Sequence, residues 1–157
     1  MPRKLRRDQA GAAHHAFPRG NGRQDIFHDD ADRQVLLVIL AGVVNGYGWH
    51  VHAYCLMRNH MHLVVQTPLP NFGAGMQRLL GTYASYLNRR HDMSGHRFKR
   101  PFKSEPIKDE RQLAAAIAYT AANPIRAGLC SEEAEWRWSS HGSGPCPHRP
   151  HVMAATH

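Results

Sequence analysis

The feature that most constrains the fold is a pair of apolar, strand-like runs placed between two helix-like segments. Residues 49–57 read WHVHAYCLM and residues 60–68 read HMHLVVQTP, and both runs are rich in β-branched and aromatic side chains. Only Arg58 and Asn59 separate them. This pattern predicts a β-hairpin whose second strand begins with two histidines.

Helix-like segments lie on either side of this hairpin. Residues 29–48 open with acidic side chains, continue as a long apolar run and close at Gly46 and Gly48, which predicts a helix of roughly four turns. Residues 71–91 predict a second, amphipathic helix, because apolar side chains recur there at helical spacing, namely Met76, Leu79, Leu80, Tyr83 and Leu87.

Two shorter strands and one more helix complete the pattern. Residues 11–18, GAAHHAFP, and residues 101–108, PFKSEPIK, are the strand candidates. Asp109 is the expected N-cap of a helix over residues 110–122. We expect this helix to stop where Asn123 precedes a proline, because proline disfavours helical geometry in the residue before it.

The order of these segments is strand, helix, strand, strand, helix, strand, helix. It predicts an α+β fold of the ferredoxin-like βαββαβ type, with an antiparallel sheet and an added C-terminal helix. A chain of 157 residues is about one domain long, and we place that domain at residues 1–140. Residues 141–157 are rich in Gly, Pro and His, and we expect a disordered tail there.

Composition narrows the class of protein further. No apolar run approaches the roughly 20 residues that span a bilayer, and no apolar stretch follows the basic N-terminus as in a secretory signal. We therefore expect a cytoplasmic protein with no membrane partner. The three cysteines, Cys55, Cys130 and Cys146, form no CxxC pair, which argues against a disulfide framework and a thiolate zinc site.

The charge balance favours a polyanionic partner. The chain has 20 Lys and Arg residues against 12 Asp and Glu, a formal net charge of +8. Cationic surfaces bind nucleic acids because each neutralised phosphate releases condensed counterions. A basic composition with no specific partner is the alternative.

The two histidines of the hairpin are a candidate metal half-site. Side chains alternate along a strand, so His60 and His62 point to one face of the sheet. Neutral imidazoles bind divalent cations, and a strand fixes their separation. Two histidines that only satisfy hydrogen bonds beneath a helix would show the same spacing. His50 and His52 form a second such pair, so spacing alone does not choose between them.

The last helix offers the remaining groups. Tyr119 and Asn123 are four residues apart, which places them one turn apart on the same helix face. An amide oxygen can complete a coordination sphere begun by two imidazoles, and a tyrosine hydroxyl can attack a phosphodiester. A core aromatic is the alternative role for Tyr119. The competing tyrosines are Tyr83, which has core-like apolar neighbours, and Tyr54 and Tyr86.

Four separated segments carry a resemblance to a known family. They are MPRKLRRDQAGAAHHAFPRGNGRQDIF, GWHVHAYCLMRNHMHLVVQTP, MQRLLGTYASYLNRRH with GHRFKRPFKS, and YTAANPIRAGL followed by WRWSS. In this order they resemble the single-tyrosine HUH (IS200-like) transposases and, within that superfamily, the REP-associated tyrosine transposases. The resemblance covers roughly residues 1 to 140.

The resemblance implies a chemistry for the candidate site. Tyr119 matches the catalytic nucleophile, His60 and His62 match the metal ligands, and Asn123 matches a helix residue that assists metal binding. Such proteins use Mg²⁺ or Mn²⁺ to cut and rejoin single-stranded DNA near REP-like hairpins through a covalent 5′-phosphotyrosine. They occur as monomers or homodimers.

The chain departs from the family pattern at three places. Arg58 stands where a proline is usual, so the hairpin turn is expected to differ. Phe98 and Lys99 replace a common pair of an aromatic residue and a glutamine, which bears on DNA contact. The first strand, AAHHAF, is less β-branched than usual. No proposed site residue is lost.

A set of basic and aromatic residues is expected to contact DNA. Phosphate contacts would supply most of the affinity, and Phe98 and Phe102 can stack on unpaired bases at about 1–3 kcal/mol each. A solvated surface is the alternative for any one of these residues. The DNA-binding candidates are Arg3, Lys4, Arg6, Arg7, Arg19, Arg23, Arg89, Arg90, His96, Arg97, Phe98, Lys99, Arg100 and Lys103.

Two other functions remain open from the sequence. One is a domesticated protein that binds hairpin DNA or RNA without cutting it. The other is a metal-dependent phosphodiesterase that uses water as the nucleophile, in which His50 and His52 join the site. The transposase or site-specific single-strand endonuclease is preferred, because all four of its active-site positions are filled.

Overall fold

The computed structural model describes residues 9–142, and its elements follow the predicted order. The N-terminal cations before residue 9 and most of the predicted tail lie outside the described residues. No helix within the described part of the chain is long and apolar enough to cross a membrane. The elements are β1 (Ala12–Ala16), η1 (Asn21–Arg23), α2 (Asp30–Tyr47), β2 (His50–Leu56), β3 (Met61–Thr67), α3 (Phe72–Arg90), β4 (Ser104–Ile107), α4 (Glu110–Arg126) and η2 (Glu133–Glu135).

The four strands form one antiparallel sheet in the order β2-β3-β1-β4. Strand β1 therefore lies beside β3, with His15 opposite Val64 and Ala16 opposite Leu63. This order confirms the predicted α+β, ferredoxin-like βαββαβ arrangement. It also brings the first strand against the strand that carries the candidate metal histidines.

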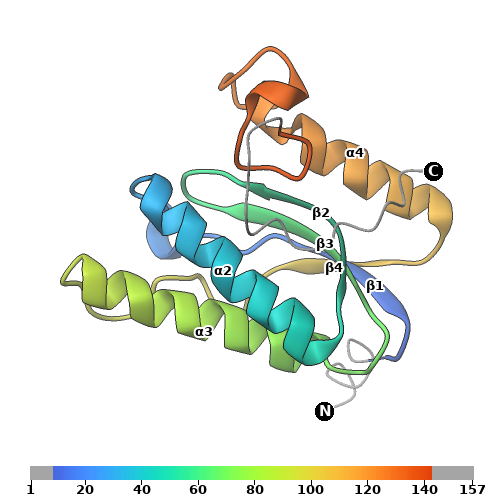
Figure 1. Ribbon diagram of the computed structural model, residues 1–157, viewed down its shortest axis with the longest axis horizontal. Helices are drawn as coiled ribbons and strands as arrows, with labels where there is room; N and C mark the ends of the chain where they lie inside the picture. Colours follow the sequence, from blue (N-terminus) through green and yellow to red (C-terminus); the bar gives the residue numbers. More distant parts are fainter. Residues whose placement is uncertain (1–8, 143–157) are drawn as a thin grey trace.

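Helices cover the two faces of the sheet unequally. Helices α2 and α3 pack on one face, and α4 lies across the other (Figure 1). The main core lies between the sheet and the α2–α3 pair. Its larger members include Leu36, Leu40, Tyr54, Met61, Leu63, Met76, Leu79 and Tyr83. The predicted alternation holds in β3, because Met61, Leu63 and Val65 belong to this core and His62 does not.

A buried carboxylate ties α2 to α3. Asp32 is fully buried and accepts hydrogen bonds from the Tyr86 hydroxyl at 2.8 Å and from Arg90 Nη1 at 2.6 Å. Its second oxygen accepts from the backbone N–H of His28 and lies 3.0 Å from His91 Nε2. The start of α2 is therefore fixed to the end of α3.

Helix α4 is longer than predicted. It runs to Arg126 with Pro124 inside it, instead of stopping at residue 122. Backbone hydrogen bonding resumes past the proline, since the Ala127 N–H donates to Asn123 O and the Leu129 N–H donates to Pro124 O. Asn123 consequently keeps helical geometry one turn after Tyr119.

The segment after α4 returns to the sheet. The backbone N–H of Leu56 donates to Trp138 O at 2.8 Å, and the N–H of Ser140 donates to Tyr54 O at 2.9 Å. The Trp136 indole N–H donates to Leu56 O at 3.1 Å. These bonds cover the outer edge of β2, which would otherwise present unpaired backbone groups.

Candidate active site

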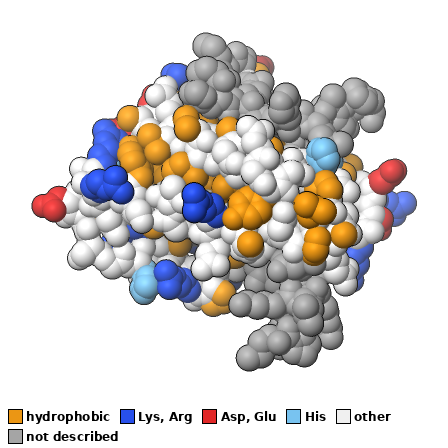
Figure 2. Space-filling model, turned by 60° about the horizontal axis from the view of Figure 1, so that its bottom comes forward, with side chains coloured by type: hydrophobic (Ala, Val, Ile, Leu, Met, Phe, Trp, Pro, Cys, Tyr) orange, Lys and Arg blue, Asp and Glu red, His pale blue; other side chains and the backbone are white. Residues whose placement is uncertain are grey.

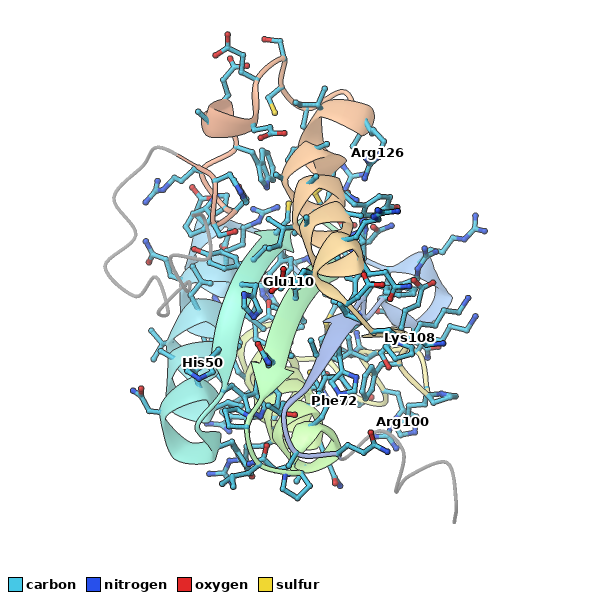
Figure 3. All side chains as sticks on the ribbon, turned by 90° about the vertical axis from the view of Figure 1, so that its right-hand side faces the viewer. His50, Phe72, Arg100, Lys108, Glu110 and Arg126 are labelled. Carbon is cyan, nitrogen blue, oxygen red and sulfur yellow. The ribbon has the colours of Figure 1, made fainter. Side chains whose placement is uncertain are left out.

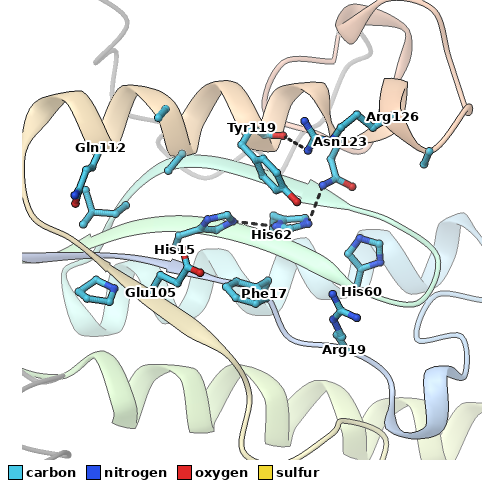
Figure 4. A pocket seen from close by; sticks show the side chains of 15 residues that line it. His15, Phe17, Arg19, His60, His62, Glu105, Gln112, Tyr119, Asn123 and Arg126 are labelled. Atoms are coloured by element: carbon cyan, nitrogen blue, oxygen red, sulfur yellow. Dashed lines mark hydrogen bonds between the residues drawn. The ribbon is translucent and has the colours of Figure 1, made fainter.

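An open cavity of about 840 Å³ lies between α4 and the sheet. Figure 3 shows α4 lying across this face of the sheet. Side chains from β1, the start of β3, β4 and α4 all reach the cavity (Figure 4). The residues that carry reactive or charged groups into it are His15, Arg19, His60, His62, Glu105, Gln112, Tyr119, Asn123 and Arg126.

The predicted histidine pair does converge. The ring centroids of His60 and His62 are 5.2 Å apart. His60 precedes β3 and its backbone pairs with Arg19, which brings that arginine to the cavity. The Nδ1 atom of His60 lies 2.8 Å from Asn59 Oδ1. Because an amide oxygen only accepts, Nδ1 carries the proton and Nε2 keeps its lone pair.

Asn123 joins the two imidazoles. Its Nδ2 atom lies 3.0 Å from His62 Nε2. Burial lowers the pKa of His60, and the Asn123 side chain, acting as a hydrogen-bond acceptor, opposes part of that shift. Asn123 is 8% exposed, so the amide faces the histidines rather than solvent. The structure thus brings together the three residues expected to bind metal.

Tyr119 lies beside them. Its ring centroid is 5.5 Å from that of His62, and 48% of the residue is exposed, which leaves it accessible from the cavity. The guanidinium of Arg126 lies over the ring, 3.9 Å from its centroid. The candidate nucleophile is therefore on the same side of the sheet as the histidines.

His15 is a site residue that sequence reasoning missed. It lies on β1 and is 8% exposed, and its Nε2 atom is 2.9 Å from His62 Nδ1. Its ring centroid is 5.8 Å from that of Tyr119. The available signal was its place in AAHHAF, because a βαββαβ sheet puts this strand beside β3 and makes a same-face polar residue a neighbour of His62.

Arg126 was also missed, although it lies in the motif NPIRAGL. It is seven residues after Tyr119, which is two helical turns and therefore the same face. With Arg19 it gives the cavity two guanidinium groups near the histidines. Such a cavity attracts phosphate.

Burial and positive neighbours keep the histidines neutral. Burial is the main cause that lowers the pKa of His62 to about 3, and unfavourable electrostatic interactions with His15, His60, Arg126 and Arg19 add to it. Burial also lowers the pKa of His60 and of His15. A neutral imidazole has a lone pair, and two imidazoles with an amide oxygen form a donor set that can hold a divalent cation. At His62 Nε2 the cation would take the place of the Asn123 amide hydrogen bond.

The second histidine pair does not join the cavity. His50 is exposed, and His52 is buried with its Nε2 atom 3.1 Å from Gln66 Oε1. The competing tyrosines are also elsewhere. Tyr54 and Tyr83 are fully buried in the core, as expected for Tyr83, and the Tyr86 hydroxyl bonds Asp32.

A further cluster of potential metal ligands lies on the opposite face of the sheet. One ligand atom each from His28, Asp32 and His91 lies within 4.8 Å of the others, so the three residues could hold a metal ion. The Asp32 carboxylate, however, already takes part in the hydrogen bonds that tie α2 to α3. This cluster is separate from the cavity that holds Tyr119.

The predicted DNA contacts divide into three groups. Four of them, Arg3, Lys4, Arg6 and Arg7, lie outside the described residues. Figure 2 shows Lys and Arg side chains at several places on the face that carries α2 and α3, separated by hydrophobic side chains. Apart from Arg19, which lines the cavity, and Arg90, which is ion-paired, six candidates are exposed, namely Arg23, Arg89, His96, Lys99, Arg100 and Lys103.

The third group is engaged within the protein. Arg90 forms ion pairs with Asp29 at 2.7 Å and with Asp32 at 2.6 Å. Arg97 is 9% exposed and donates to Gln24 Oε1 and Ser94 O. These guanidinium groups already have acceptors, so they offer less to a phosphate than the exposed cations do.

Phe98 corrects one expectation. Its backbone pairs with Gly20, which turns the ring inward, and the residue is 6% exposed and part of the core. The prediction that Phe98 stacks on an unpaired base is therefore wrong for this conformation, because the ring is buried. Phe102 is partly buried, with its ring 5.9 Å from that of Phe72.

The loop around Phe98 borders a second cavity. This cavity is about 800 Å³ and lies between α3 and residues 95–102. Three exposed basic side chains border it, namely His96, Lys99 and Arg100. The predicted DNA contacts of this loop therefore lie together at the border of the second cavity.

The fold and the cavity together define an α+β protein in which α4, the helix with Tyr119, lies across the sheet face that holds His60 and His62, a His-x-His pair at the start of β3. The family model described as "Transposase IS200 like" matches residues 10–123. The chain belongs to the IS200-like transposase family.

One solved structure is similar over most of the chain. It is described as "Structure of the REP associates tyrosine transposase bound to a REP hairpin", and the similarity covers 84% of this chain and 77% of that one. The TM-score is 0.70 at 15% sequence identity, so the likeness concerns the fold. No curated protein matches the chain.

Proposed function

We propose that this protein is a site-specific single-stranded DNA endonuclease and transposase that cuts and rejoins DNA near hairpins. The observation that carries the proposal is the position of Tyr119, whose ring centroid lies 5.5 Å from that of His62 in a cavity with two arginines. Membership of the IS200-like transposase family supports it. So does the similar fold of a REP-associated tyrosine transposase bound to a REP hairpin.

His60, His62 and Asn123 are the residues that would hold Mg²⁺ or Mn²⁺. Two neutral imidazoles and one amide oxygen can bind a divalent cation, and membership of the IS200-like transposase family supports Mg²⁺ or Mn²⁺ as that cation. When bound, the cation would supply Lewis-acid polarisation of the scissile phosphate. Arg19 and Arg126 line the same cavity and would bind the non-bridging phosphate oxygens.

Tyr119 would then act as the nucleophile. Its phenolic oxygen forms a bond to phosphorus, and the bond between phosphorus and the 3′ oxygen breaks. The phenol loses its proton to water, and the departing 3′ oxygen takes one up. The products are a 5′-phosphotyrosine and a free 3′-hydroxyl, whose attack on the same phosphorus rejoins the strand.

The exposed cations would hold the rest of the DNA. Arg23, Arg89, His96, Lys99, Arg100 and Lys103 are exposed and available to phosphates. We propose Arg3, Lys4, Arg6 and Arg7, which lie outside the described residues, as further DNA contacts. Phosphate contacts of this kind give an affinity that falls steeply with salt. We propose that the protein acts on DNA in the cytoplasm as a monomer or a homodimer. Size-exclusion chromatography of the free and DNA-bound protein would distinguish these two oligomeric states.

A labelled single-stranded hairpin oligonucleotide incubated with Mn²⁺ or Mg²⁺ tests the proposal. We expect a covalent adduct with the wild type and with Tyr47→Phe, a matched change away from the cavity, and none with Tyr119→Phe. A hairpin that is bound but never cut would indicate a non-cleaving binding protein. Cleavage without an adduct, unaffected by Tyr119→Phe, would indicate a phosphodiesterase that uses water.

A further inference from the structure

We infer that His15 is a positioning residue for His62. By accepting a hydrogen bond from the His62 Nδ1–H group, it keeps the lone pair of His62 Nε2 directed toward Asn123 and the cavity. The inference rests on the proposed function, because it assigns His15 to the metal-binding half of that site. Nothing in the spacing of His60 and His62 requires such a residue.

The geometry is specific. His15 Nε2 lies 2.9 Å from His62 Nδ1, and the two rings are 5.1 Å apart between centroids at an interplanar angle of 40°. His15 is 8% exposed and His62 is 6% exposed, so water competes little for this bond. The contact joins residues 47 positions apart and depends on the pairing of β1 with β3.

The direction of the hydrogen bond follows from Asn123. Its amide nitrogen lies 3.0 Å from His62 Nε2 and can only donate, so Nε2 is the acceptor. A neutral imidazole with an unprotonated Nε2 carries its proton on Nδ1. That proton points at His15 Nε2, which must therefore be unprotonated. His15 in turn carries its own proton on Nδ1.

The other histidine of the pair has an equivalent partner. Asn59 Oδ1 lies 2.8 Å from His60 Nδ1 and holds the proton of His60 on that atom. Each candidate metal ligand thus has an acceptor on Nδ1 and a lone pair on Nε2. His15 does for His62 what Asn59 does for His60. Partners of this kind orient metal-binding histidines, and their loss typically costs 10- to 100-fold in metal affinity.

The test is a titration of the purified full chain with Mn²⁺, in which electron paramagnetic resonance measures the bound and free ion. His15→Phe fills the space of the imidazole without an acceptor, whereas His15→Gln supplies an amide oxygen near the position of Nε2. His52→Phe is the matched control, because it removes a buried histidine of the neighbouring strand that does not line the cavity. Thermal unfolding of each variant verifies that it is folded.

We expect His15→Phe to weaken Mn²⁺ binding by about 10- to 100-fold. His15→Gln should restore affinity to within a fewfold of the wild type, and His52→Phe should leave it unchanged. Equal affinities for the wild type and His15→Phe would overturn the inference while leaving the covalent chemistry of Tyr119 intact. A wild type that binds no Mn²⁺ would overturn the inference and the metal site together, and a wild type that binds Mn²⁺ without forming an adduct would count against the proposed function alone.

Discussion

The guanidinium of Arg126 lies 3.9 Å from the centroid of the Tyr119 ring, and its Nη2 atom donates to the Tyr119 carbonyl at 3.0 Å. Both residues belong to α4, which continues through Pro124. Among the described residues, no carboxylate forms an ion pair with Arg126. A positive charge is therefore fixed beside the candidate nucleophile and remains available to a phosphate.

Replacing Arg126 should slow the formation of the phosphotyrosine. We expect Arg126→Met to reduce the rate of adduct formation by about 100-fold, because a fixed donor to the developing negative charge is lost. Arg137→Met is the matched control, since Arg137 lies 4.6 Å above Trp138 and does not line the cavity. Single-turnover cleavage of a labelled hairpin measures both rates. Equal rates for Arg126→Met and the control would contradict this role.

The buried carboxylate of Asp32 should contribute more to the free energy of unfolding than the exposed carboxylate of Asp30 on the same helix. Asp32→Asn removes a buried charge that accepts from Tyr86 and Arg90, and we expect a loss of about 2–4 kcal/mol in the free energy of unfolding. Asp30→Asn is the control. Its carboxylate is 62% exposed and pairs with Arg33 at 3.5 Å, so the expected change is about 0.5 kcal/mol or less. Urea denaturation gives both values, and similar losses would refute the assigned role of Asp32.

The order of the elements could be predicted from the sequence because each element has its own periodicity. Strand β3 shows this clearly, since alternation alone placed Leu63 in the core and His62 on the other face. The meeting of His62 with Tyr119 and Asn123 also followed, once the last helix was assigned to that face. Helical spacing placed Tyr119 and Asn123 on one helix face, and the resemblance to the family joined that face to the histidines.

The remaining site residues depend on contacts between elements. His15 meets His62 only because β1 pairs with β3, and no local pattern marks that contact. Phe98 had basic neighbours typical of a DNA-binding loop, but its backbone pairs with Gly20 and its ring enters the core. The extra turn of α4 after Asn123 was missed for a different reason. A proline disfavours helix in the residue before it without forbidding it.

Two glycines of α3 should respond in opposite ways to the same substitution. A Cβ atom on Gly75 would lie 2.1 Å from Trp49 Cζ2, whereas a Cβ on Gly81 meets nothing within 4 Å. We expect Gly75→Ala to lower the free energy of unfolding by about 1–3 kcal/mol, because the buried indole must move. Gly81→Ala should raise it by about 0.5–1 kcal/mol through helix propensity. Urea denaturation measures both, and a neutral Gly75→Ala would show that the indole yields freely.

The neutral state of His62 should make stability depend on pH. Its pKa of about 3 in the folded protein is below the value near 6.5 of an exposed histidine, with burial as the main cause. Between these values the unfolded chain binds a proton that the folded protein does not. The stabilisation is therefore complete above about pH 6.5 and is lost as the pH falls toward 3.

His62→Gln should flatten this dependence. Metal-free urea denaturation of the wild type and the variant at intervals from pH 7.5 to 4.5 tests the prediction, in a range above the titration of most carboxylates. We expect the difference in unfolding free energy to be constant above about pH 7. Below pH 6 the wild type should lose up to about 1.4 kcal/mol more per pH unit than His62→Gln, the slope for one proton. Parallel curves over the whole range would mean that the folded protein protonates His62 as readily as the unfolded chain does.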